Sequence, residues 1–524
     1  MLTQIRHLVF GSPLPSAGLG ETRLDKVRAL AALSPDALAS VAYANQEIYL
    51  GLLVAGAAGL GHAFNLALVI SGLLALLTLS YRQTIAAYPS GGGSYTVARE
   101  NLGDMPGLVA AAALLIDYVL NAAVSVTAGV AALASALPAL WPHRTPLSLA
   151  LLLLITLINL RGVREAGTVM TIPVYLFLAT YLGLIAWGIG VALIGGPGVF
   201  PTVLPAPGQA GAAAGLAPVT LFLLLRTFAS GATALTGVEA ISNAVPVFKD
   251  PVVRNAQRTM AAMAVLMAVL FLGTIGLTQY LAVVAGPEET ILSALARRLF
   301  GSGAIHLLTQ VATLLVLVVA ANTSYTGFPR VVSLMARDGF LPRQLRAVGD
   351  RLVYSNGILL LTGLAALLVV VFRGDTHALI PLFAVGAFLA FTLSQAGMVV
   401  HWWRERGPGW KGKAALNGLG ATATGVALLV IGAGKFAGGA WIVILLLPLL
   451  VLLFRAVRRH YAEVGRQLRL NEDAPAVGCA RHPRVVMPVA GVHRGVVEAL
   501  NFACSIADDV IAVYVELEPD TGET

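Results

Sequence analysis

Three acidic side chains lie inside long apolar stretches of this 524-residue sequence. Asp36 stands near the start of one stretch, Asp117 lies within a second, and Glu239 lies within a third. A carboxylate in an apolar segment is costly to bury, so it usually faces a cavity or a partner. The sequence therefore predicts a site for a small polar or ionic ligand among apolar helices.

The stretch that holds Glu239 has the composition of an interrupted helix. The residues before it are small or hydroxylated: Ser230, Gly231, Thr233, Thr236 and Gly237. Such residues lower helix propensity and allow the backbone to open where it lines a site. We interpret this stretch as a discontinuous membrane helix built around the ligand. The alternative is a helix that packs through its small residues, with Glu239 bound by a neighbouring helix.

The first acidic stretch, residues 34–59, begins with a polar helical face. Asp36, Ser40, Tyr43 and Glu47 recur at steps of three and four positions, which places them on one side of a helix. We predict that Asp36 and Tyr43 contribute to the site. The alternative is an amphipathic turn at the membrane interface, and Glu47 fits that alternative.

The second acidic stretch, residues 106–137, carries a stripe of three polar side chains. Asp117, Asn121 and Ser125 lie four positions apart on an otherwise apolar helix. A single buried acid could be a feature of packing, but an acid, an amide and a hydroxyl in line are typical of a water-lined path. The stripe therefore predicts a polar path along this helix.

A glycine-rich loop follows the apolar stretch at residues 62–81. Its motif YPSGGGSY contains three consecutive glycines at positions 91–93. It is not a phosphate-binding loop of the Walker type, because the Lys and Ser or Thr of that motif do not follow. We predict a tight re-entry or gating loop at the membrane face.

The composition predicts an integral membrane protein. Hydrophobic residues make up 57% of the chain and charged residues 11%, whereas soluble domains carry about 25% charged residues. The length leaves room for about a dozen spanning helices. Counted from the stretch at residues 34–59, the second, fourth and every later even-numbered apolar stretch is followed by Lys or Arg, as at Arg82, Arg161 and Lys249. This alternation predicts that both termini lie in the cytoplasm. This asymmetry explains the net charge of +8, so no nucleic-acid partner is indicated.

The sequence also argues against other classes of protein. Cys479 and Cys504 lie outside the apolar stretches and do not form a CxxC pair, so neither a disulfide framework nor a zinc site is indicated. We find no nucleophile–base pattern and predict that the protein is not an enzyme and uses no cofactor.

Residues 1–33 are basic and predict a cytoplasmic lead without a cleaved signal peptide, in which residues 25–32 form a short surface helix.

The tail differs from the rest of the chain. After a polar linker at 457–480, residues 481–524 have the pattern strand, helix, strand, which begins a parallel α/β unit. About forty residues are too few for a whole doubly wound domain, so we expect a partial one. Gly491, His493 and Arg494 lie in or beside its first loop, where such sheets bind nucleotides. The alternative is a plain linker between strand and helix.

The order of the polar stretches predicts an internal repeat. The stretch at residues 34–59 heads one block of five apolar stretches, and the interrupted stretch around Glu239 heads the next. Interrupted segments at matching positions of two halves indicate an inverted-repeat transporter with its site near the middle of the membrane. We expect the transporter domain to cover residues 34–456, with two further helices after the repeats. This pattern does not identify the substrate.

Five motifs together resemble those of one transporter family: SPDALASVAYANQE, YRQTIAAYPSGGGSYTVARENLG, LLIDYVLNAAVS, NLRGVREAG and LTGVEAISNAVPVFK. They are similar to the KimA-like potassium importers of the Kup group, in the amino acid–polyamine–organocation superfamily, and the tail resembles a universal-stress-protein domain. The resemblance covers nearly the whole chain. It implies proton-coupled potassium (K+) uptake across the bacterial cytoplasmic membrane on a LeuT-like 5+5 fold. It also implies a homodimer that cyclic di-AMP inhibits through the tail.

The resemblance implies a cation site as well. By position, its residues are Asp36, Tyr43, Asp117, Asn121, Ser125, Thr236 and Glu239. Glu239 is the first choice for the coupled proton and Asp117 the second. The sequence departs from the family pattern at Asn121, where threonine is usual, and at Phe383, where tyrosine is usual. Asn121 still offers a carbonyl oxygen, whereas Phe383 offers no ligand, so cation affinity and selectivity stay open.

Two other functions stay open at this stage. An amino-acid or polyamine permease could share the fold, but the first stretch has no glycine before Gly51 to expose donors for a substrate carboxylate. A membrane nucleotide sensor that transports nothing would not need buried carboxylates. A hard monovalent cation prefers carboxylate, hydroxyl and carbonyl oxygens, and the sequence supplies that set. Transport stoichiometry and the nucleotide stay undetermined.

Overall fold

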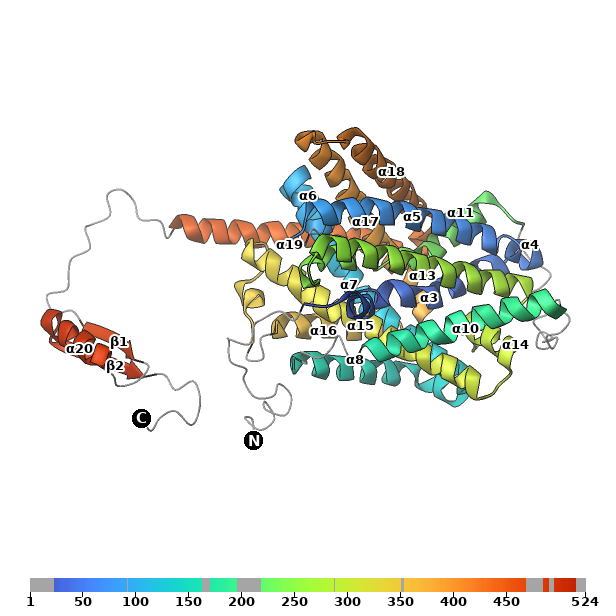
Figure 1. Cartoon of the computed structure of the whole chain (residues 1–524), viewed down its shortest axis with the longest axis horizontal. Coiled ribbons are helices and arrows are strands. Elements are labelled where there is room, and N and C mark those ends of the chain that lie inside the picture. Colours follow the sequence, from blue (N-terminus) through green and yellow to red (C-terminus); the bar gives the residue numbers. More distant parts are fainter. Residues whose placement is uncertain are drawn as a thin grey trace. The chain divides into compact units, whose positions relative to one another are not determined.

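The structure is a computed structural model that describes residues 23–91, 93–162, 170–195, 218–286, 288–349, 353–467, 484–489 and 494–514. The chain divides into two compact units, residues 1–460 and 461–524. The described residues are mostly helical, as predicted, and Figure 1 shows the larger unit as a bundle of long helices.

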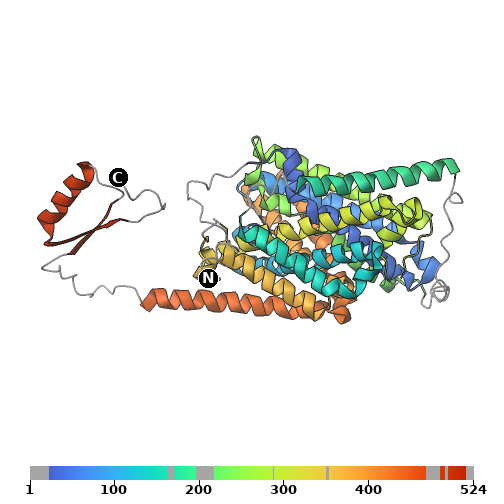
Figure 2. The same ribbon diagram turned by 90° about the horizontal axis from the view of Figure 1, so that it is seen from below.

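The first part of the bundle precedes the interrupted segment. Its helices are α2 (Lys26–Leu33), α3 (Pro35–Leu53), α4 (Gly56–Leu60), α5 (Ala63–Ala87), α6 (Ser94–Leu102), α7 (Asp104–Ala136), the 3-10 helix η2 (Pro138–His143), α8 (Arg144–Leu160) and α10 (Thr171–Gly195). In Figure 2, α10 lies along one edge of this unit and α19 along the opposite edge.

The second part begins with the interrupted segment. Its elements are α11 (Leu221–Gly231), η4 (Ala232–Leu235), α12 (Ala240–Asn243), η5 (Val245–Val247), α13 (Val252–Tyr280), α14 (Ile291–Phe300), α15 (Ala304–Arg337), η6 (Arg343–Arg346), α16 (Ser355–Val371), α17 (Thr376–Glu405), α18 (Trp410–Lys435), η7 (Phe436–Gly438) and α19 (Ala440–Gln467). The last helix continues past the linker start predicted at 457, because the polar residues after Phe454 include good helix formers such as Arg, Ala and Glu.

Ten helical segments within the described residues are long and apolar enough to cross a membrane. The sequence predicted about twelve spans. The other two predicted spans are α16, which is apolar but has only 17 residues, and α3, which carries several polar side chains. Yet 15 of the 19 residues of α3 are buried. A polar helix inside an apolar bundle must direct its polar groups toward partners or a cavity.

The short helix before the first membrane helix is buried rather than exposed. The sequence predicted it at residues 25–32 as a surface helix. In the structure α2 packs on α10 and α13 and buries Ala29, Leu30 and Ala31. Only Ser34 separates α2 from α3. The apolar face of this short helix explains the difference, because it is buried against the bundle.

The helix around Glu239 is interrupted, as predicted. The chain leaves η4, becomes extended at Thr236 (φ −64°, ψ 153°), and takes a φ of +78° at Gly237 before α12 begins. A left-handed conformation costs an L-residue about 1–2 kcal/mol. Glycine avoids that cost, so Gly237 is the residue that permits the break.

One buried carboxylate ties three helices together at one end of the bundle. Glu47 of α3 is 2.7 Å from Nδ1 of His377, in the first turn of α17, and 3.7 Å from Nζ of Lys435, at the end of α18. Glu47 is therefore not part of an interfacial turn, as one interpretation of the sequence had it. A buried acid with two basic partners is stabilised in place, whereas losing one partner would leave an uncompensated charge.

The opposite end of the bundle is held by a second polar network. Asp338, just after α15, pairs with Arg99 of α6 and accepts a 2.6 Å hydrogen bond from Tyr95. Asp104, at the start of α7, pairs with Arg99 (3.2 Å) and with Arg458 of α19 (2.9 Å). Burial and the Asp338 carboxylate raise the pKa of Tyr95, so its phenol stays protonated and donates.

The smaller unit has the predicted order of strand, helix and strand. β1 (Arg484–Val489) pairs in parallel with β2 (Asp509–Tyr514), and α20 (Arg494–Ile506) connects them. A parallel pair needs such a crossover connection. The likeness of this unit to a universal-stress-protein domain remains a prediction.

Candidate functional site

The structure brings the three predicted acids close enough to interact. Asp36 on α3, Asp117 on α7 and Glu239 beside α12 are each 5–6% exposed, and each interacts electrostatically with the other two. Asp36 Oδ1 and Asp117 Oδ1 are buried without a hydrogen-bond partner among the described residues. A bare carboxylate in such a place costs several kcal/mol unless a cation or a proton compensates it. This region therefore requires a positive ligand or protonation.

Asp36 packs directly on the break in the interrupted helix. A Cβ atom built on Gly237 would lie 2.6 Å from the carboxyl carbon of Asp36. One turn along α3, Ser40 donates a 2.7 Å hydrogen bond to the backbone oxygen of Ala234. The missing side chain at Gly237 thus allows the acid to approach the opened backbone.

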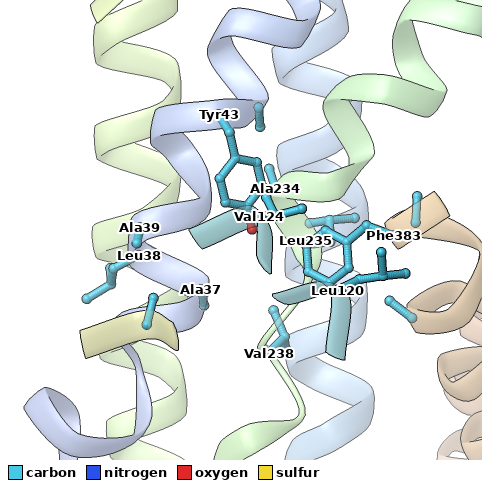
Figure 3. Packing of buried hydrophobic residues seen from close by; sticks show 14 of the residues in the cluster. Ala37, Leu38, Ala39, Tyr43, Leu120, Val124, Ala234, Leu235, Val238 and Phe383 are labelled. Carbon is cyan, nitrogen blue, oxygen red and sulfur yellow. The ribbon is translucent and has the colours of Figure 1, made fainter. Parts of the chain in front are cut away.

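Tyr43 extends the same contact by a further turn. Its hydroxyl lies 3.1 Å from Oγ1 of Thr236, the extended residue of the break. Figure 3 shows the Tyr43 ring directed from α3 toward the unwound stretch, with the ring of Phe383 approaching from α17. The two ring centroids are 6.2 Å apart. Phe383 therefore forms an apolar wall at the place where the family pattern would have a hydroxyl.

Glu239 has partners that the sequence analysis missed. Ser94 Oγ donates a 2.7 Å hydrogen bond to Glu239 Oε2, and Tyr81 Oη lies 3.5 Å from the same oxygen. Ser94 is the first residue of α6, directly after the glycine-rich loop. A serine that follows a run of glycines at a helix start was the available signal. Nothing in the sequence around Tyr81 indicated its contact.

Asn121 and Ser125 lie on the predicted stripe with Asp117, but they form their own pair. Ser125 donates to Asn121 Oδ1 (3.0 Å), and the Asn121 amide donates to Ser324 Oγ on α15 (3.0 Å). The first of these hydrogen bonds lies within α7, and the second links α7 to α15. The Asn121 carbonyl that was predicted as a cation ligand is thus already engaged by Ser125, although its second lone pair remains for a ligand.

A cavity of about 370 Å³ opens beside Tyr43, near the end of the bundle that holds Glu47. Its lining includes Tyr43, Gln46, Trp141, Thr376 and His377. A larger cavity of about 700 Å³ lies beside α14 and α15, and none of the predicted site residues lines it. Of these two cavities, the smaller one is therefore the one that adjoins a predicted site residue, Tyr43.

The oxygen atoms at the break suit a cation of low charge. In the described part of the chain, no three His, Cys, Asp or Glu side chains converge closely enough to hold a metal ion by themselves. The oxygens present are of mixed kinds, namely carboxylates, the Tyr43 and Thr236 hydroxyls, and backbone carbonyls. Such a mixed set is typical of transported monovalent ions rather than of structural metals.

The predicted nucleotide-binding loop falls mostly outside the described residues. Gly491 and His493 lie outside them. Arg494 opens α20 with an exposed side chain, and its Nε donates a 3.2 Å hydrogen bond to Glu498. The site predicted there stays a prediction.

Comparison with known proteins places the chain in a family of transporters. The sequence profile of the amino acid permease family matches residues 37–460. The potassium transporter KimA of Bacillus subtilis (strain 168) is 43% identical over 520 residues, which covers 99% of this chain and 84% of that protein. The chain belongs to the amino acid permease family and, within it, to the KimA-like transporters.

A more distant relative marks the breadth of that family. The low-affinity putrescine importer PlaP of Escherichia coli (strain K12) is 24% identical over 354 residues, which covers 64% of this chain and 73% of that protein. Together with the ten apolar helices, these matches describe a multi-pass membrane protein.

The contact between Gly237 and Asp36 predicts the effect of a substitution. We expect Gly237→Ala to lower the free energy of unfolding by about 2 kcal/mol or more. The new Cβ would meet Asp36, and the alanine would have to adopt the positive φ of this position. Equilibrium unfolding in mixed micelles measures the change. The matched control is Gly183→Ala in α10, where a Cβ would meet nothing within 4 Å. Equal stability of the two variants would contradict the assigned role of Gly237.

Proposed function

We propose that the protein is a potassium–proton symporter that imports K+ across the bacterial cytoplasmic membrane. The observation that carries this proposal is the cluster of three buried carboxylates at the break, two of which have an oxygen without a hydrogen-bond partner in the described part of the chain. Potassium would be the transported ion. Asp36, Tyr43, Thr236, Asp117 and Glu239 supply oxygen atoms of the kinds that K+ prefers.

The same cluster supports coupling to protons. A desolvated carboxylate without a cation favours its neutral form, and an arriving cation favours the charged form. Protonation and cation binding are therefore linked at such a site. Glu239 is the first candidate for the proton carrier and Asp117 the second. In this proposal the excess of Lys and Arg after the even-numbered spans keeps both termini in the cytoplasm.

A proton-coupled polyamine or amino-acid permease is the second candidate. The match to a putrescine importer favours a polyamine over an amino acid, because a polyamine is also a cation that carboxylates can bind. The cavity of about 370 Å³ is large enough for a small organic molecule.

A competition experiment separates the two candidates. Excess putrescine should leave rubidium uptake unchanged in a potassium carrier.

The carboxylates provide the direct test of the site. We expect Asp36→Asn, Asp117→Asn and Glu239→Gln each to reduce uptake at least about a hundredfold, because loss of a charged ligand to a desolvated cation costs about 3 kcal/mol or more. Rubidium flux into liposomes measures this, and rescue of a potassium-uptake-deficient bacterium at low potassium extends it. Glu463→Gln on the exposed end of α19 is the control. Wild-type flux in all three variants would refute the site.

Proton coupling has its own measurement. We expect uptake of K+ to acidify the lumen of liposomes that contain the protein, and an imposed pH gradient to drive uptake when the membrane voltage is held fixed. Both follow from the linkage between protonation and cation binding. A pH-sensitive dye in the lumen reports the first effect. Flux that ignores the pH gradient at fixed voltage would rule out symport.

The tail suggests regulation of this transport. We propose that cyclic di-AMP binds the C-terminal domain and inhibits uptake by preferring one transport conformation, in a homodimer whose size light scattering can measure. Isothermal titration on the protein, and on a variant that ends after Gln467, tests the location. We expect tight binding only when the tail is present. Tight binding after removal of the tail would place the nucleotide in the membrane unit.

A further inference from the structure

The glycine-rich loop lies against the end of the interrupted helix. Gly91 has a φ of +93°, and a Cβ there would lie 2.9 Å from the backbone oxygen of Asn243, the last residue of α12. A Cβ on Gly93 would lie 2.7 Å from Asn243 Oδ1. Both distances are shorter than real Cβ contacts. The approach of this loop to α12 therefore depends on the missing side chain at Gly91, which faces backbone, whereas the Asn243 side chain could turn away from a Cβ at Gly93.

This close approach brings the start of α6 to the acid of the break. Asn243 lies one turn after Glu239 and donates its backbone N–H to the Glu239 carbonyl (3.1 Å). Ser94, the next residue after Gly93, then reaches Glu239 Oε2 at 2.7 Å. Ser94 is 0% exposed and Tyr81 is 1% exposed, so water does not compete for the same bonds.

The surroundings of Glu239 make this hydrogen bond important for its charge. The ionisable groups that face it from neighbouring helices are acids and phenols: Asp36 on α3, Tyr81 on α5, and Asp117 and Tyr118 on α7. The acids repel a negative charge on Glu239, whereas a donated hydrogen bond favours it. The positive end of α6 begins at Ser94 and acts in the same direction. At 2.7 Å Ser94 makes the strong bond, and Tyr81 at 3.5 Å contributes less.

We propose that Ser94 and Tyr81 are positioning residues that set the charge of Glu239, and that the glycine-rich loop is the element that delivers Ser94 to it. This inference rests on the proposed proton-coupled transport. When the loop packs on Asn243, Ser94 stabilises the charged carboxylate that binds a cation. When the loop withdraws, Glu239 loses its main donor and takes up a proton more readily.

The pH dependence of uptake tests this role. We expect Ser94→Ala to move the whole pH profile of rubidium uptake to higher pH by about one unit, because the carboxylate without its donor remains protonated to a higher pH. Tyr81→Phe should move the profile in the same direction by less. Flux is measured with the full chain in liposomes at fixed voltage, over a range of pH.

Two matched controls separate this role from general damage. Ser148→Ala removes a buried hydroxyl that bonds only within α8, and Tyr325→Phe removes a buried phenol that bonds Thr156. Both should leave the profile in place even if the rate falls. A Ser94→Ala profile that matches that of Ser148→Ala would overturn the inference.

The loop supplies a second, independent variant. Gly91→Ala keeps Ser94 but forces the loop away from Asn243, because the new Cβ would meet the Asn243 backbone oxygen, so it should reproduce the shift of Ser94→Ala. The double variant should shift no further, since both changes remove the same bond. Additive shifts would overturn the role of the loop. A wild-type rate that does not vary with pH would overturn proton coupling itself, whereas a pH-dependent wild type with unshifted variants would overturn only the present inference.

Discussion

The packing of α3 against the opened backbone of the interrupted helix is the contact on which the site depends. Asp36 meets Gly237, Ser40 binds the Ala234 carbonyl, and Tyr43 meets Thr236. These three residues of α3 lie on one helical face. The contacts hold both the acid and the tyrosine at the place where the helix ends and its backbone groups become available. A Cβ at one position, Gly237, would disturb all of them.

The buried acids differ in what surrounds them, and this difference separates structural from functional carboxylates. Glu47 has His377 and Lys435 as partners, so its charge is balanced within the protein. Among the described residues, Glu239 has hydroxyl donors but no basic partner, and Asp36 and Asp117 each retain an oxygen without a hydrogen bond. A low-dielectric interior makes such unpaired groups unstable unless a ligand or proton arrives. Glu47 therefore has a structural role, whereas the other three acids are the ones available to the ligand of the proposed function.

The two ends of the bundle are held by different interactions. At one end, Glu47 joins α3, α17 and α18 beside the cavity that reaches Tyr43. At the other, Asp338 and Asp104 tie α6, α7, α15 and α19 through Arg99 and Arg458. A carrier that works by alternating access must loosen each end in turn. The pairs of Asp104 with Arg99 and Arg458 are partly exposed, and such ion pairs are weak enough to be exchanged during such a cycle.

The sequence by itself determined where the interrupted helix breaks and which helices carry the acids of the proposed site. Membrane helices follow from composition, because twenty apolar residues match the bilayer thickness, and the break follows from Gly237, whose conformation other residues avoid. The face of α3 was predictable because helical spacing is a local property. Only the tertiary structure decided what each polar group meets: Ser94 and Tyr81 for Glu239, His377 and Lys435 for Glu47, and Ser324 for Asn121. The two members of each of these pairs lie 145 to 388 positions apart in the sequence. Contacts between helices depend on how whole helices pack, and residue spacing along one helix does not encode that packing.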